Sequence, residues 1–141
     1  VAPQNFIAEL AKLRRIIDRQ GDLSMEQALG EMLEEGEIQR HLKKAQKVYH
    51  SRRDLLCQIL SADFDGMVQY KKPHGGLAVW TEWEKEMNLL QMSRHCQRNN
   101  LYLPQTLLFQ TDQVRAVRLG FGNMNESEMI QALAILRESI P

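Results

Sequence analysis

Apolar and polar positions alternate with a helical period over the first part of the chain. Between Pro3 and Gly21 an apolar side chain recurs every three or four positions, which predicts an amphipathic helix that ends near Gly21. These apolar residues are Phe6, Ile7, Leu10, Leu13 and Ile17. Ser24 then predicts the start of a second helix, because Gln27 three residues later completes a capping box. Gly36 interrupts this second helix.

A longer helix is predicted from about Glu37 to Leu60. Its apolar face consists of Ile38, Leu42, Ala45, Tyr49, Leu56 and Ile59. Acidic residues cluster near its start and basic residues follow, an order that suits the helix dipole. The basic residues are Arg40, Lys43, Lys44, Lys47, Arg52 and Arg53. We interpret them as a solvated helix face in preference to the alternative, an anion or nucleic-acid surface.

The pattern changes to short extended segments after this helix. Strands are predicted over residues 67–70 and 77–80, with the segment KKPHGG as the turn between them. The pattern is helical again from Glu82 to Asn99, and LYLPQTLLF is then a short extended stretch that Pro104 breaks.

The last strand and the last helix are predicted close to the end of the sequence. The strand covers Val114 to Phe121. Asn125 is expected to cap the final helix, with Glu128 closing a capping box. We expect the buried face of that helix to be formed by Met129, Ile130, Leu133, Leu136 and Ile140.

Helices followed by mixed strands and helices predict an α+β fold. We expect a small, mostly antiparallel sheet with helices packed on it, preceded by two short helices and one long helix. The helices of residues 1–36 have no evident partner, so they are expected to pack on a large domain outside this chain or on a partner subunit, while residues 37–141 form the small domain. The sequence starts at Val1 without an initiator methionine, so we expect residues 1–141 to be a single domain fragment of a longer protein.

Arg118 interrupts the apolar pattern of the last strand. Strand alternation places Val117, Leu119 and Phe121 on one face and Arg118 on the other, between the small residues Ala116 and Gly120. This arrangement leaves room over the guanidinium, whose planar fork matches a carboxylate. The two hypotheses are a carboxylate receptor and a solvent-facing arginine, and the pattern alone favours the second.

Composition and charge restrict the classes of function. The chain has 18 basic and 18 acidic residues, so its net charge is zero, which disfavours direct binding of DNA or RNA by this chain. There is no signal peptide and no apolar run long enough for a membrane span, so we expect a cytoplasmic protein. Cys57 and Cys96 lack metal-ligand spacing and are expected to be small core or boundary residues.

Other side chains give weaker indications. The histidines at positions 41, 50, 74 and 95 have no metal-ligand spacing, so no metal site is predicted. Gly75 and Gly76 could allow a ligand to approach the backbone closely, although a plain hairpin turn explains them equally well. Trp80 and Trp83 are expected to be core or interface residues in preference to a stacking platform.

Five segments resemble the C-terminal part of fold-type I aminotransferases, which depend on pyridoxal phosphate. They are LRRIIDRQGD, EEGEIQRHLKKAQKVYHSRRD, KPHGGLAVW, LYLPQTLLF and VRLGFGNMNESEM. They occur in the order of the family and span nearly the whole chain. IDRQGD and EGEIQRHL are most similar to the aminotransferase-like domain of MocR-type regulators in the GntR superfamily.

The resemblance implies roles for three residues. Arg118 resembles the arginine that holds the substrate's α-carboxylate, which reverses the preference given by the strand pattern alone. Gly75 and Gly76 resemble a segment near the substrate. The chain departs from the family at PQTLLF, where Gln105 and Thr106 replace a small pair, so the lining of the pocket there is expected to differ.

The resemblance also implies the cofactor and the partners. Pyridoxal 5'-phosphate is expected in the full-length protein only, because no lysine here matches the Schiff-base lysine of the family; Lys71 and Lys72 occupy the KKPHGG turn. No catalytic residue is therefore predicted in this chain. The expected partners are an amino acid or 2-oxo acid, a second copy of the full-length protein in a homodimer, and DNA only through an N-terminal domain outside this chain.

Two functions of the whole protein follow from the resemblance. The first is a transcriptional regulator whose aminotransferase-like domain binds an amino-acid effector or a pyridoxal phosphate adduct. The second is a free-standing aminotransferase that transfers an amino group from an amino acid to a 2-oxo acid. The regulator-like segments favour the first.

Overall fold

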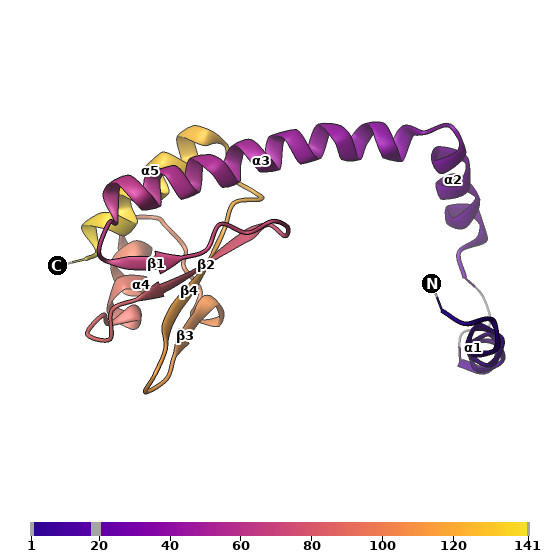
Figure 1. The fold of residues 1–141 in the computed structure, drawn as a ribbon, viewed down its shortest axis with the longest axis horizontal. Helices are drawn as coiled ribbons and strands as arrows, with labels where there is room; N and C mark the ends of the chain where they lie inside the picture. Colours follow the sequence, from indigo (N-terminus) through magenta and orange to yellow (C-terminus); the bar gives the residue numbers. More distant parts are fainter. Residues whose placement is uncertain (1, 18–20, 141) are drawn as a thin grey trace. The chain divides into compact units, whose positions relative to one another are not determined.

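The computed structural model describes residues 2–17 and 21–140 (Figure 1). Val1 and positions 18–20 of the segment LRRIIDRQGD therefore lie outside the described residues. The elements are α1 (Gln4–Ile17), α2 (Leu23–Glu34), α3 (Glu37–Asp63), β1 (Val68–Tyr70), β2 (Ala78–Trp83), α4 (Leu89–Arg98), the 3-10 helix η1 (Gln105–Leu107), β3 (Leu108–Gln110), β4 (Arg115–Gly120) and α5 (Glu126–Glu138). The chain divides into two compact units, Val1–Lys44 and Ala45–Pro141, so the division falls within α3, later than the predicted boundary at residue 36.

The first unit consists of helices without a covered face. No described residue of α1 or α2 is buried. Their exposed apolar side chains include Phe6, Ile7, Leu10, Leu13, Leu29 and Leu33. The capping box expected at Ser24 is wrong, because Asp22 is the N-cap and its carboxylate accepts a hydrogen bond from the Met25 amide at 3.0 Å. An aspartate two residues earlier meets the same need for an acceptor.

The second unit contains the predicted antiparallel sheet. Its strand order is β1-β2-β4-β3, and every neighbouring pair is antiparallel. The two long strands pair in the register Ala78 with Gly120 and Thr81 with Val117. The α+β fold class predicted from the sequence is confirmed.

One face of the sheet is the core of the second unit. Val79, Trp83 and Val117 lie on it and are buried with residues of α3, α4 and α5. The helical contributions are Leu56, Cys57, Leu60, Leu89, Met92, Cys96, Met129, Leu133 and Leu136. Thr81 is the one buried polar residue among the described residues, and its hydroxyl donates to the Val117 carbonyl at 2.8 Å. The core expectation for both cysteines is confirmed.

The predicted helix from Glu82 to Asn99 begins too early. The strand β2 continues to Trp83, which pairs with Val68, and α4 begins only after Asn88 caps it. Glu82 and Trp83 fit the end of a strand as well as the start of a helix. The pairing of Trp83 with Val68 in β1 makes them part of the strand. Pro104 is followed by η1, so the stretch LYLPQTLLF is extended only in part.

Candidate functional site

Arg118 lies on the face of the sheet opposite the core. Its position in β4 is directly opposite Trp80 in β2, and both side chains are exposed. Val117 and Phe121, on the other face, are buried. Alternation along β4 thus turns Arg118 away from the core, as the strand pattern predicts.

The free space beside Arg118 is smaller on the side of Ala116 than on the side of Gly120. The rings of Trp80 and Phe109 lie 4.7 Å apart between centroids, and Phe109 is opposite Ala116 in the register. Ala116 is fully buried, and we infer that the two rings cover it. The expected room next to the guanidinium is therefore limited to the side of Gly120, which is exposed.

A cavity of about 380 Å³ lies at that end of β4. Arg118 is the only charged residue among those that line it. The apolar lining comes mainly from Leu77, from residues 101–107 and from α5. Among the described residues Arg118 has no ion-pair partner and no side-chain hydrogen bond, so the donors of its fork are available to a ligand. An arginine at the edge of an apolar cavity is suited to a carboxylate that carries an apolar group.

Leu77 lines this cavity and directly follows Gly75 and Gly76 in the chain. The Phe121 amide donates to the Leu77 carbonyl at 2.9 Å, and a Cβ added to Gly122 would lie 3.4 Å from Leu77 Cδ1. A second cavity of about 230 Å³ also has Leu77 in its lining, together with both glycines. The structure thus places the three predicted site residues around one leucine, although Arg118 and the glycines line different cavities.

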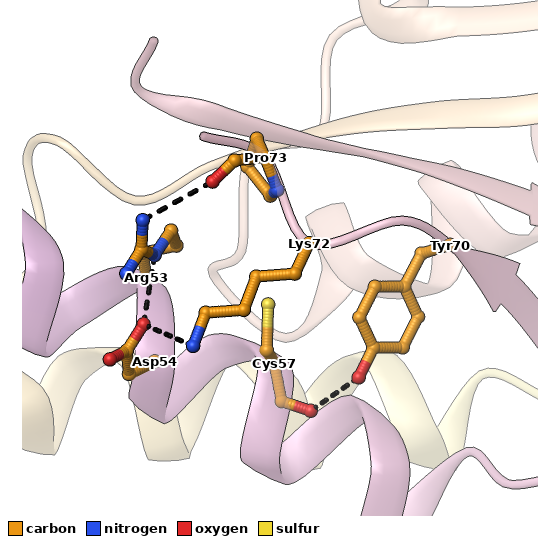
Figure 2. Close-up of polar contacts among 6 residues, drawn as sticks. All are labelled: Arg53, Asp54, Cys57, Tyr70, Lys72 and Pro73. Atoms are coloured by element: carbon orange, nitrogen blue, oxygen red, sulfur yellow. Dashed lines mark hydrogen bonds and ion pairs between the residues drawn. The ribbon is translucent and has the colours of Figure 1, made fainter. Parts of the chain in front are cut away.

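Two arginines of α3 hold the loops that frame these cavities. The Arg52 guanidinium donates to the Gly122 carbonyl, just beyond β4. The Arg53 guanidinium donates to the Pro73 carbonyl at 3.2 Å, in the turn before the glycines (Figure 2). Charged hydrogen bonds of this kind contribute about 1.5–3 kcal/mol each. We infer that α3 positions both loops.

Two further contacts join α3 to the turn and to the end of β1, and Figure 2 also shows them. Lys72 Nζ lies 2.9 Å from Asp54, which also accepts a hydrogen bond from Arg53 Nε at 2.8 Å. The Tyr70 hydroxyl donates to the Cys57 carbonyl at 2.7 Å. Hydrogen bonds from Arg53 and Lys72 lower the pKa of Asp54 from 3.8 to about 2, because they favour its charged form. Burial raises the pKa of the Cys57 thiol, which is therefore not an activated nucleophile.

The described residues do not by themselves form a pyridoxal phosphate site. No lysine, aspartate or glutamate lines the cavity beside Arg118, whereas the cofactor needs an amine for its aldehyde and an acid for its pyridine nitrogen. Lys72 is occupied by Asp54. Within residues 2–17 and 21–140, no group of three His, Cys, Asp or Glu residues could hold a metal ion. No helix within residues 2–17 and 21–140 is long and apolar enough to cross a membrane.

Comparison with known proteins identifies the class of this fold. No family model matches the chain. Its fold is that of fold-type I aminotransferases: LysN, the α-aminoadipate aminotransferase of Thermus thermophilus, superposes with a TM-score of 0.78 at 18% identity. The match covers 99% of this chain and 36% of LysN, in agreement with a C-terminal fragment. The resemblance seen in the sequence is confirmed.

Curated relatives fall into two groups of proteins. An uncharacterized aminotransferase of Saccharolobus solfataricus is 22% identical over 142 residues, which is 99% of this chain and 35% of the relative. The HTH-type transcriptional regulator NorG of Staphylococcus aureus is 23% identical over 133 residues, 94% of this chain and 30% of the relative. The chain thus spans about a third of the length of these relatives.

Several residues of this site escape a prediction from the sequence. Arg52 and Arg53 belong to the basic run interpreted above as a solvated face, yet both are half-buried and bind loop carbonyls. Trp80 is 41% exposed and contacts Phe109, so it is not a core residue, and its predicted alternative role at an interface stays a prediction. The only feature of the sequence that points to a buried role for the two arginines is their position just before Leu55 and Leu56, which begin the apolar part of this helix.

Proposed function

We propose that this chain is the C-terminal part of an aminotransferase-like domain in which Arg118 binds the carboxylate of an amino acid or 2-oxo acid. The observation that carries the proposal is an exposed arginine without an acidic partner in the described chain, at the edge of an apolar cavity. The arginine offers two parallel donors to the two carboxylate oxygens. Gly75 and Gly76 contribute indirectly, because their turn holds Leu77 between the two cavities.

We propose that pyridoxal 5'-phosphate is bound by the longer protein and not by this chain. LysN, which shares the fold, is complexed with N-(5'-phosphopyridoxyl)-L-leucine. The cofactor supplies the electron sink when it is bound. The part of this chain is to orient the carboxylate and to surround the rest of the ligand with apolar side chains.

For the whole protein we favour a regulator of the MocR type over an enzyme. Similarity to NorG over 94% of the chain and the IDRQGD and EGEIQRHL segments support this function. In such a protein DNA is bound by a separate N-terminal domain, the effector is an amino acid or its cofactor adduct, and two copies form a dimer. The zero net charge of this chain fits a domain that does not itself contact DNA.

A free-standing aminotransferase is the second candidate. Similarity to the Saccharolobus solfataricus protein, which covers 99% of the chain, favours it. The coding sequence upstream of Val1 separates the two. A basic winged helix-turn-helix ahead of a lysine-bearing large domain supports the regulator, and a large domain without a DNA-binding module supports the enzyme.

Arg118→Ala tests the role of the site in the full-length protein. We expect the variant to lose about 1.5–3 kcal/mol of binding free energy for an amino-acid ligand, the usual contribution of a charged hydrogen bond. Isothermal titration calorimetry measures the loss. Arg98→Ala is the control, because Arg98 is an exposed arginine of α4 that does not line the cavity. Equal affinity in the wild type and Arg118→Ala would refute the proposal.

A further inference from the structure

The second cavity, which shares Leu77 with the first, is lined by side chains of a different kind. Its lining comes from α3 and from the turn after Pro73, and it contains Arg53, His50 and His74 but no carboxylate. Gly75 and Gly76 line it as well, and within the described chain neither amide donates to a backbone or side-chain acceptor. Donors from two elements therefore surround a space of about 230 Å³.

The engagement of Arg53 limits what this cavity can bind. Arg53 Nε donates to Asp54 and Nη1 donates to the Pro73 carbonyl (Figure 2). Two of the five N–H groups of Arg53 are thus engaged, whereas those of Arg118 are not. One N–H group on Nη1 and both on Nη2 remain as charged donors. A ligand with several acceptor oxygens in different directions matches this arrangement better than a carboxylate does.

The charge around the cavity also favours an anion. Asp54 is shared between Arg53 and Lys72, so these three residues together carry one positive charge. The histidines at positions 50 and 74 are exposed and add ring N–H donors. Contacts of Tyr70, Lys72 and Pro73 with α3 hold the segment that leads into the turn, so the backbone next to Gly75 and Gly76 is organised before a ligand binds.

We propose that this cavity is an oxyanion site for a phosphate group, either free or as a monoester. Arg53 Nη2 contributes the charge, the histidines at positions 50 and 74 contribute side-chain donors, and the amides of Gly75 and Gly76 contribute backbone donors. Backbone amides in a turn commonly donate hydrogen bonds to bound phosphate. This phosphate site is separate from the cavity in which Arg118 is proposed to bind a carboxylate.

A titration of the 141-residue chain with inorganic phosphate tests the proposal. At constant ionic strength we expect saturable shifts of the Gly75 and Gly76 amide resonances in ¹H–¹⁵N NMR spectra. His50→Gln and His74→Gln should each weaken binding, and the double variant should weaken it about tenfold or more, equivalent to about 1.4 kcal/mol. These substitutions leave Arg53 and its contact with Pro73 intact. His41→Gln is the matched control, because His41 is an exposed histidine of α3 that does not line the cavity.

Further titrations separate the alternatives. Tighter binding of glycerol 3-phosphate than of inorganic phosphate supports a phosphomonoester, and the reverse order supports free phosphate. Shifts that do not saturate, that appear equally with chloride, or that are stronger with acetate would overturn the proposal. Arg118→Ala should leave the phosphate shifts unchanged, so a failure of this site is distinguishable from a failure of the carboxylate site.

Discussion

Arg118 and Arg53 show how neighbours decide what an arginine can bind. Arg118 has no partner in the described chain and lies at an apolar cavity, so both edges of its guanidinium remain available. Arg53 is half-buried and already donates to Asp54 and Pro73. The first is suited to two-point binding of a carboxylate, and the second has fewer N–H donors left for a ligand.

Asp54 gives a prediction at the scale of one ionisable group. Its folded pKa of about 2 lies below the ordinary value of 3.8, so ionised Asp54 favours the folded state. This contribution is present above 3.8 and is lost as the pH falls towards about 2. We expect the Asp54 carboxyl to titrate near 2 in pH-dependent NMR spectra of the folded chain.

Replacing one of the two donors identifies the cause of that shift. Lys72→Met should raise the pKa of Asp54 towards 3.8 without reaching it, because the Arg53 hydrogen bond remains. Lys71→Met is the matched control, since Lys71 is an exposed lysine without an ion pair among the described residues. A native Asp54 that titrates at 3.8 would show that these contacts do not persist in solution.

At the scale of elements, α5 depends on a complete capping box. Asn125 accepts a hydrogen bond from the Glu128 amide at 3.0 Å, and the Glu128 carboxylate accepts one from the Asn125 amide at 2.8 Å. The helix buries Met129 and Leu133 against the core. Loss of the cap therefore destabilises an element that carries part of the core.

Asn125→Ala should lower the free energy of unfolding by about 1 kcal/mol, the typical cost of losing such a cap. Urea denaturation followed by circular dichroism measures the change. Gln131→Ala, at an exposed position of the same helix, should change stability by no more than about 0.5 kcal/mol. Equal effects of the two substitutions would mean that the cap does not contribute to stability.

The same helix shows which parts of the fold a sequence can predict. The capping box at Asn125 and Glu128 is local, so the spacing of these two residues is enough to place it, and the structure confirms it. The end of β2 at Trp83 depends on pairing with Val68, which no local pattern contains. The contact between Trp80 of β2 and Phe109 of β3, two strands that both pair with β4, likewise depends on strand order. The orientation of Arg118 is predictable from alternation, but the carbonyls that Arg52 and Arg53 bind, 70 and 20 residues away, are not.

At the scale of the molecule, this chain is about a third of the length of its curated relatives. Its first unit has apolar side chains on α1 and α2 that no described residue buries. Its second unit has its own core and both cavities. We therefore expect ligand contacts in the second unit.

The last prediction concerns the cofactor and the chain as a whole. The sequence has seven lysines, but none lines the cavity beside Arg118, and Lys72 is paired with Asp54. After addition of pyridoxal phosphate and reduction with borohydride, we expect only diffuse, substoichiometric labelling of exposed lysines by mass spectrometry. Lys72→Gln should leave this pattern unchanged at the other lysines. One mole of label per mole of chain at a single lysine would contradict the prediction, because it would place the amine that holds the cofactor within these 141 residues.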